Sequence, residues 1–212
     1  MSKESIYAKL VRAYYKLGRS LSALCNILKL KLFGVKVSGR PYVCGHLYLE
    51  RGDEAEISIG DRFRCISGGG RNRIGRNIRS GIFASPSARI SIGRDVGISC
   101  SCIWAREEIV IGDGVNIGAD CVVMDHDAHS LDPTIRRDRS LDRDSAATAK
   151  IVIEEDVLIG ARSIVLKGTH IGKGSVIGAG SIVTGEIPPM QIWGGHPAKY
   201  IRDIPQAAAK KD

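Results

Sequence analysis

Aliphatic residues recur every six positions through the C-terminal half of the chain, and this period is its clearest signal. The series is Ile153, Ile159, Val165, Ile171, Ile177 and Val183. A small hydroxyl residue fills the fifth position of four of these hexapeptides: Ser163, Thr169, Ser175 and Ser181. A period of six matches neither the turn of an α-helix, about 3.6 residues, nor the simple alternation of a hairpin strand. It predicts a hexapeptide β-helix, whose three flat faces close a coil of about 18 residues.

The same period extends upstream with less regularity. One phase holds Ile111, Ile117 and Val123, and another holds Ile92, Ile98 and Trp104. Ile74 precedes Ile92 by one full coil of 18 residues. We therefore expect coils from about residue 40 to about residue 188, with small slips before Ile74 and Ile111 and one long interruption between Val123 and Ile151. Stacked coils would join their aliphatic rows into one continuous core.

The first 34 residues form a separate region. Residues 4–32 predict an amphipathic helix, because apolar side chains recur at a spacing of three and four residues: Leu10, Tyr14, Leu17, Leu21, Leu24 and Leu28. Gly34 is expected to end it. Two interpretations stay open: the helix packs on the β-helix or a neighbouring subunit, or residues 1–33 lie on a membrane surface. The regions predicted are thus 1–34, 35–188 with a loop at 124–150, and a C-terminal segment at 189–212.

Composition narrows the class of protein. The 212 residues suit one domain with an appendage. No apolar run of roughly 18 to 20 residues and no signal-peptide pattern is visible. Six cysteines without a paired framework suit a reducing cytoplasm, and Cys100-x-Cys102 lacks the second pair of a zinc site, so no metal is expected. The net charge is +8, but no aromatic stacking platform lies among the basic residues. The charge therefore favours a polyanionic cofactor or an anionic membrane surface as the binding partner, rather than nucleic acid.

The interruption at residues 124–150 is the candidate catalytic segment. A long polar loop in an otherwise strict repeat is usually functional or disordered, and this one carries His126 and His129. A neutral imidazole, with an ordinary pKa near 6.5, can accept a hydroxyl proton at neutral pH. Either histidine could be that base, and Asp125 or Asp127 could orient the ring by accepting its second N–H.

Three motifs carry a resemblance to a known family. They are Ile177-Gly-Ala-Gly-Ser-Ile-Val-Thr, the segment Pro197-Ala-Lys-x-Ile-Arg, and His129-Ser-Leu-Asp-Pro in the loop. Together with the coils they resemble the hexapeptide-repeat acyltransferases, closest to galactoside, maltose and polysaccharide O-acetyltransferases, over about residues 57–203. The resemblance implies an all-β fold, a left-handed parallel β-helix with a helical N-terminus and a short C-terminal segment. It also implies acetyl-CoA as cosubstrate and a homotrimer with sites between subunits.

The resemblance also implies roles for single residues. The loop histidine before the Leu-Asp-Pro run is the general base of the family, which is His129 here, with His126 as its rival. The positions that would contact acetyl-CoA are Ala161 at the thioester, Ala179 at the pantetheine, Thr184, and Lys199 with Arg202 near the nucleotide phosphates. Gly185 departs from the pattern, since the family commonly has Lys there.

Two further departures bear on the acceptor. Leu158 stands where the family commonly has Trp. The position at which galactoside-type enzymes have an Asn that helps hold the acceptor falls near Ile98 or Ser99 in this chain, so that contact is absent or shifted. We therefore expect a glycan or polysaccharide precursor, a nucleotide sugar or a lipid-linked sugar rather than a simple galactoside. The prediction is a cytoplasmic O-acetyltransferase, with contact to the inner membrane face left open. The alternatives are N-acetylation of an amino sugar, a non-catalytic scaffold, and a γ-type carbonic anhydrase, which would need a differently spaced histidine set.

Overall fold

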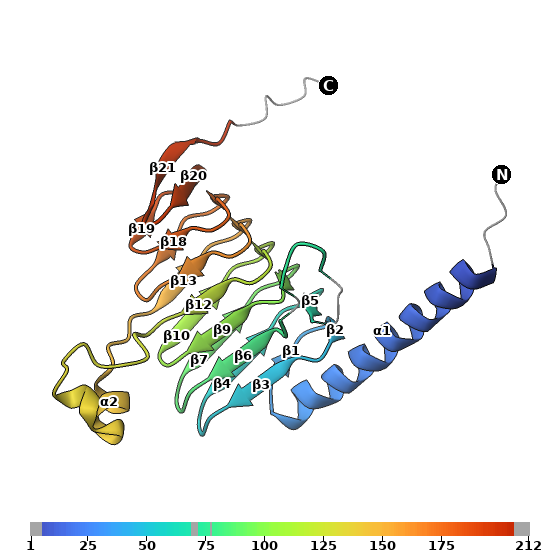
Figure 1. Cartoon of the computed structure of the whole chain (residues 1–212), viewed down its shortest axis with the longest axis horizontal. Helices are drawn as coiled ribbons and strands as arrows, with labels where there is room; N and C mark the ends of the chain where they lie inside the picture. Colours follow the sequence, from blue (N-terminus) through green and yellow to red (C-terminus); the bar gives the residue numbers. More distant parts are fainter. Residues whose placement is uncertain (1–5, 69–71, 77, 206–212) are drawn as a thin grey trace.

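The chain folds into a tapering stack of coils with a long helix at its base (Figure 1). The computed structural model describes residues 6–68, 72–76 and 78–205. For residues 6–17 and 19 it describes the backbone but not the side chains. The helices are α1 (Ile6–Leu32) and α2 (Arg139–Ser145), with a 3-10 turn, η1, at Ile135–Arg137. Successive strands pass from one sheet to the next, so each coil adds one strand to each of three sheets.

The three sheets are parallel and form the faces of a prism. The first, here called sheet A, contains β1 (Lys36–Val37), β4 (Glu56–Ile59), β7 (Arg89–Ile92), β10 (Glu108–Ile111), β13 (Ile151–Ile153), β16 (His170–Ile171) and β19 (Glu186–Ile187). Sheet B contains β2 (Tyr42–Gly45), β5 (Arg64–Ser67), β8 (Gly97–Ser99), β11 (Asn116–Ile117), β14 (Leu158–Ile159), β17 (Val176–Ile177), β20 (Gln191–Gly195) and the antiparallel β21 (Ala198–Asp203). Sheet C contains β3 (Tyr48–Arg51), β6 (Gly81–Ala84), β9 (Cys102–Ala105), β12 (Val122–Met124), β15 (Ile164–Val165) and β18 (Ile182–Val183).

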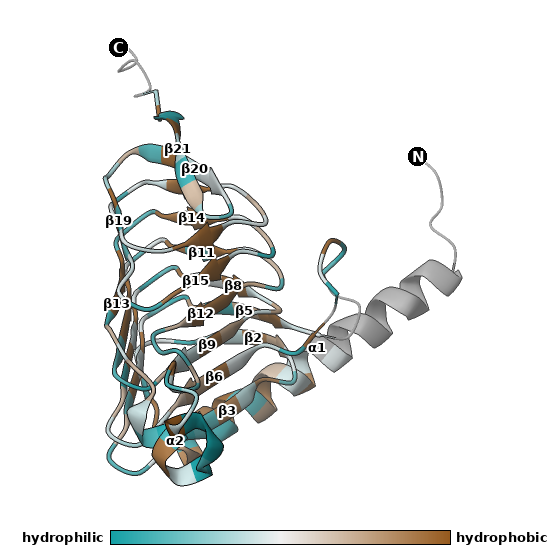
Figure 2. Ribbon diagram, turned by 60° about the vertical axis from the view of Figure 1, so that its left-hand side comes forward, coloured by the Kyte–Doolittle hydropathy of each residue, from teal (hydrophilic) through white to brown (hydrophobic). Residues whose placement is uncertain are grey.

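The six-residue period is confirmed in the C-terminal coils. Ile153 pairs with Ile171, Ile159 with Ile177 and Val165 with Val183, one coil apart in each case. All six side chains are buried and belong to one core cluster that runs through the stack. Figure 2 shows this hydrophobic lining along the strands. The hydroxyls at the fifth positions are buried too and donate to backbone carbonyls, as Ser181 does to Gly178 at 2.6 Å, which satisfies their polarity inside the core.

Two predicted positions in the N-terminal coils are wrong. Ile74 is 68% exposed and lies in a second loop between β5 and β6, while Ile59 pairs directly with Ile92. Trp104 is 37% exposed on the outside of sheet C, and its neighbour Ile103 is buried instead. Only five positions separate Ile98 from Ile103, so the corner between them is one residue shorter than the period requires and the inward register shifts.

Close stacking of the corners explains the glycine that follows many of the aliphatic residues. At Gly160 an added Cβ would lie 2.4 Å from the backbone nitrogen of Ala179 on the next coil. At Gly118 it would lie 2.6 Å from the backbone nitrogen of Ala161. Both distances are shorter than any van der Waals contact, so the corner between sheets B and C has no room for a larger residue.

The predicted N-terminal helix is confirmed as α1, and Gly34 follows it with a positive φ of 67°. One face packs on β2, where the Asn26 amide donates to Gly45 O at 2.6 Å and accepts from Leu47 N at 3.3 Å. Packing on the β-helix is therefore confirmed for that face. Leucines of another face stay exposed: Leu21, Leu24, Leu28 and Leu32. Within the described part of the chain, no helix combines the length and apolar composition that spanning a bilayer requires.

Candidate active site

The interrupting loop leaves the stack at the corner between sheets C and A. It runs from β12 to β13 and contains η1 and α2. The Asp138 side chain caps α2 by accepting the N–H groups of Ser140 and Leu141. Asp127 joins the loop to the next coil through Lys167, at 2.5 Å between carboxylate oxygen and Nζ. The Asp138 cap thus orders α2 within the loop, and the Asp127–Lys167 pair ties the base of the loop to the coils.

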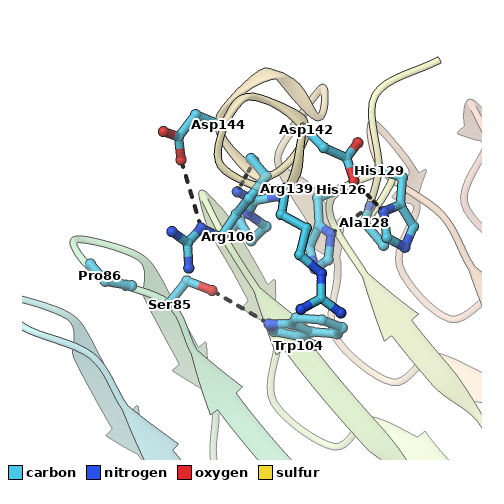
Figure 3. A pocket seen from close by; sticks show the side chains of 11 residues that line it. Ser85, Pro86, Trp104, Arg106, His126, Ala128, His129, Arg139, Asp142 and Asp144 are labelled. Atoms are coloured by element: carbon cyan, nitrogen blue, oxygen red, sulfur yellow. Dashed lines mark hydrogen bonds and ion pairs between the residues drawn. The ribbon is translucent and has the colours of Figure 1, made fainter. Parts of the chain in front are cut away.

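A cleft of about 820 Å³ opens between the loop and the coils beneath it. Sheet C and its corner supply Ser85, Pro86, Trp104 and Arg106, and the loop supplies His126, Ala128, His129, Arg139, Asp142, Arg143 and Asp144. Figure 3 shows Trp104 at the floor of this cleft and the loop residues above it. The cleft is therefore built from both a regular coil and the interruption.

His129 and Asp142 form a dyad at the edge of the cleft (Figure 3). The Nδ1 atom of His129 lies 2.6 Å from Oδ2 of Asp142, and the other carboxylate oxygen accepts the Ser130 N–H at 2.7 Å. These hydrogen bonds, that from His129 first, hold the pKa of Asp142 below its ordinary range, so it is ionised at neutral pH. A carboxylate on Nδ1 places the ring proton there and leaves Nε2 able to accept a proton. The imidazole is 69% exposed, whereas the Asp142 side chain is 10% exposed.

His126 lies in a different environment. Its side chain is buried, and its Nδ1 accepts the N–H of Ala128 at 2.9 Å, so the neutral ring carries its proton on Nε2. Burial, aided by the charge of Arg106, lowers the pKa of His126 to about 4. The ring makes a T-shaped contact with Trp104, 4.4 Å between centroids. Among the described residues Nε2 has no hydrogen-bond partner. His126 is thus a neutral group packed on the cleft floor.

The predicted orienting carboxylates contact other groups. Asp125 accepts the backbone N–H groups of Arg106 and Glu107, at 2.8 and 2.9 Å, and so fixes the corner below the loop. Asp127 pairs with Lys167. Neither is hydrogen bonded to an imidazole in the part of the chain that the structure describes, and the carboxylate that contacts His129 is Asp142. The reason is that each sits at the base of the loop, where unsatisfied backbone groups and a lysine lie closer.

Several cleft residues were missed from the sequence. Asp142 is one of several aspartates in the loop, and nothing in the sequence separates it from Asp138 or Asp144. Trp104 was assigned to the core, although an aromatic residue directly after a buried aliphatic one could have indicated an outward position. Arg139 carried no signal either, because its place three residues before Asp142, on the same helix face, is informative only once Asp142 is known.

The predicted acetyl-CoA contacts lie away from this cleft. Ala161 and Ala179 stack on consecutive coils at the corner between sheets B and C, joined by the hydrogen bond from Gly180 N to Ala161 O. Thr184 is exposed at the corner between sheets C and A, on a coil beyond the loop. Lys199 and Arg202 are exposed on β21. None of the five is among the described residues that line the cleft.

Cys65 and Cys102 are not activated thiols. Burial raises the pKa of Cys65 to about 12 and that of Cys102 to about 11, so both thiols stay protonated at neutral pH. Of the described residues that line the cleft, none is a cysteine. The arrangement therefore suits proton transfer by an imidazole rather than a covalent cysteine intermediate.

Fold and repeat define the class of this chain: it is a hexapeptide-repeat β-helix protein. A family model for the hexapeptide repeat of succinyl-transferase matches residues 108–124 and 150–185. Galactoside O-acetyltransferase of Lactococcus lactis subsp. lactis is 40% identical over 97 residues, which cover 46% of this chain and 44% of that protein. A 2,3,4,5-tetrahydropyridine-2,6-dicarboxylate N-acetyltransferase of Clostridium perfringens is 45% identical over 60 residues, 28% of this chain and 25% of that protein. The chain thus matches less than half the length of these curated relatives.

A solved structure confirms the fold class. A crystal structure of a variant of AntD, an N-acyltransferase from Bacillus cereus, contains dTDP-4-amino-4,6-dideoxyglucose and coenzyme A. It matches this chain with a TM-score of 0.55 at 20% identity, over 84% of this chain and 88% of that one. The fold is accordingly the predicted left-handed parallel β-helix. The predicted resemblance to hexapeptide-repeat acetyltransferases is also confirmed.

Proposed function

We propose that this protein transfers the acetyl group of acetyl-CoA to a hydroxyl of a carbohydrate, a glycan or polysaccharide precursor. The observation that carries the proposal is the His129–Asp142 dyad, set in an open cleft inside the loop that interrupts the coils. The sequence similarity to galactoside O-acetyltransferase supports the reaction class. His129 is the proposed base because it is exposed to the cleft, whereas His126 is buried.

The dyad can move the protons that the reaction requires. Nε2 of His129 takes the hydroxyl proton as the acceptor oxygen attacks the thioester carbonyl. Asp142 stabilises the imidazolium that results and keeps the ring in the required tautomer. When the C–S bond breaks, His129 returns the proton to the leaving thiolate. A new ester and free CoA result, and neither a metal nor a covalent enzyme intermediate takes part.

A homotrimer would complete the site. The candidate acetyl-CoA residues Ala161 and Ala179 lie at a different prism corner from His129, so a neighbouring subunit is needed to bring the two sets together. Cyclic symmetry suits a prism-shaped subunit. Light scattering on the purified protein should give three copies. Mixing inactive His129→Ala with inactive Lys199→Glu should restore part of the activity if the site is shared, and no restoration would count against a shared site.

Transfer to an amine is the second candidate. Two relatives bear N-acyltransferase names, and AntD was solved with an amino sugar. The same base would remove a proton from an attacking amine. Kinetics with a sugar and the matching amino sugar separate the two, because kcat/KM should favour the hydroxyl acceptor if the main proposal holds.

The experiment that tests the main proposal is thiol release from acetyl-CoA with a panel of glycan precursors. Acceptor-dependent release by the wild type, reduced about 100-fold or more in His129→Ala, would support it, since general-base catalysis contributes roughly 10² to 10⁴. Normal release by His129→Ala together with loss in His126→Ala would reverse the assignment of the base. Absence of both release and CoA binding would refute the enzyme and favour a scaffold.

A cytoplasmic location at the inner membrane face is proposed for α1. Leu21, Leu24 and Leu28 are each more than half exposed along one side of the helix, and the chain is basic. An apolar stripe on a basic chain suits an anionic lipid surface. Sedimentation with anionic vesicles should fall when the three leucines are changed to glutamate. If sedimentation is unchanged and the oligomer dissociates instead, the stripe contacts a second subunit.

A further inference from the structure

The cleft beside His129 is lined by more arginines than carboxylates. Arg106, Arg139 and Arg143 line it, against the carboxylates of Asp142 and Asp144. Asp142 already accepts hydrogen bonds from His129 and Ser130. Asp144 contacts Arg143 at 3.8 Å, and both side chains are about three-quarters exposed, an arrangement that contributes little to stability. The Arg106 guanidinium donates to the backbone carbonyl of Arg143, so these contacts leave the charge of Arg139 without an explanation.

Arg139 is the group whose charge is least accounted for. It opens α2, and Asp142 and Arg143 follow at three and four residues, so the three side chains share one helix face. That face borders the cleft (Figure 3). No described residue forms a salt bridge or a side-chain hydrogen bond with the Arg139 guanidinium. A free, planar guanidinium presents paired N–H donors that match two oxygens of a phosphate.

Trp104 supplies a flat apolar surface in the same cleft. His126 contacts the ring edge to face, and the indole N–H donates to the Ser85 hydroxyl at 3.4 Å, so two contacts fix its orientation. The negative face of an aromatic ring attracts the polarised C–H groups on one side of a sugar. The cleft thus offers an aromatic floor for a sugar and a guanidinium for an anion attached to it.

We propose that the acceptor binds as a sugar phosphate or sugar diphosphate. Its phosphate pairs with Arg139, with Arg106 and Arg143 adding positive charge, and its ring lies on Trp104 with the reacting group toward His129. This inference rests on the proposed acetyltransferase function and specifies the substrate class of that site. A nucleoside diphosphate sugar and a polyprenyl diphosphate sugar share the chemistry, since both carry phosphate beside a sugar.

The first test measures binding without catalysis. Inorganic pyrophosphate is titrated calorimetrically into the wild type, Arg139→Gln, Arg137→Gln and Lys199→Gln. Arg137 is the matched control, a nearby arginine of η1 outside the cleft lining. Lys199 reports on the candidate CoA phosphate site. We expect Arg139→Gln to weaken binding about 10- to 100-fold, the range of charge-assisted hydrogen bonds, and the other two to bind like wild type. Normal binding by Arg139→Gln, or loss in Lys199→Gln alone, would overturn the inference.

The second test uses matched acceptors with and without phosphate. A sugar, its 1-phosphate, a nucleoside diphosphate sugar and a short-chain prenyl diphosphate sugar are compared in the thiol-release assay. The phosphorylated forms should have a KM about tenfold lower or better, and Arg139→Gln should remove that difference while kcat is kept. The last two acceptors distinguish the nucleotide from the lipid source. If transfer occurs with equal KM values for the acceptors with and without phosphate, the phosphate subsite is refuted and the transferase function is not. Absence of release with any acceptor and of CoA binding refutes the transferase, and the pyrophosphate titration then decides the subsite by itself.

Discussion

Replacing Asp142 by asparagine tests the proposed dyad most directly. The amide oxygen of the variant can still accept the Ser130 N–H, which leaves the NH₂ group facing Nδ1 of His129. An NH₂ group donates rather than accepts, so the ring proton favours Nε2, and His129 can act as a base from that atom only in its less stable tautomer. The local fold should survive because the hydrogen bond to Ser130 is retained.

The size of the effect follows from the geometry. A hydrogen bond to a charged group contributes about 1.5–3 kcal/mol, and about 1.4 kcal/mol corresponds to tenfold in rate. The 69% exposure of the imidazole lets water compete, so the lower part of this range applies. We therefore expect kcat to fall about 10- to 30-fold while the KM for acetyl-CoA is unchanged.

The assay is steady-state thiol release, with thermal unfolding measured in parallel. Asp144→Asn is the matched control, because it removes the same charge from the same cleft and Asp144 is not bonded to His129. Its kcat should stay within about twofold of wild type, as expected for an exposed charge. Equal loss in both variants would show that cleft charge, and not orientation of His129, is what matters.

Three further predictions concern stability. The pKa of His126 is about 4 in the fold and near 6.5 in the unfolded chain, so the unfolded state takes up the proton first as the pH falls. The free energy of unfolding should therefore fall by up to about 3 kcal/mol between pH 6.5 and pH 4. Urea unfolding at pH 7.5 and 5 should show a smaller loss in His126→Asn, and an identical loss would contradict the assignment. Gly160→Ala places a Cβ 2.4 Å from Ala179 N and should cost about 1–3 kcal/mol. The control Gly18→Ala, in a helix with open space, should stabilise by up to about 1 kcal/mol, and a neutral Gly160→Ala would refute the stacking argument. Ile171→Ala should cost about 2–5 kcal/mol by leaving a cavity in the core, against far less for the half-buried Val176→Ala, and equal costs would place Ile171 outside the core.

The sequence by itself determined the stack of coils from Ile153 to Val183 and the position of the interrupting loop. Each inward residue there repeats a local rule, and its neighbours on the next coil obey the same rule, so the period alone specifies the core. The sequence also indicated His129 as the candidate base. It failed at Ile74 and Trp104, where a loop and a corner shortened by one residue break the period, and a period cannot report its own local exceptions.

Only the tertiary structure decided how the cleft is assembled. Asp142 meets His129 across 13 residues of irregular loop, and Arg106 reaches the backbone carbonyl of Arg143 across 37. Such contacts depend on how α2 folds back over sheet C, and no repeating pattern encodes that path. The structure likewise separated His129 from Ala161 and Ala179 by placing them at different corners of the prism. Corners follow from the winding of the whole coil, so residues that a motif lists together can face different sides of the molecule.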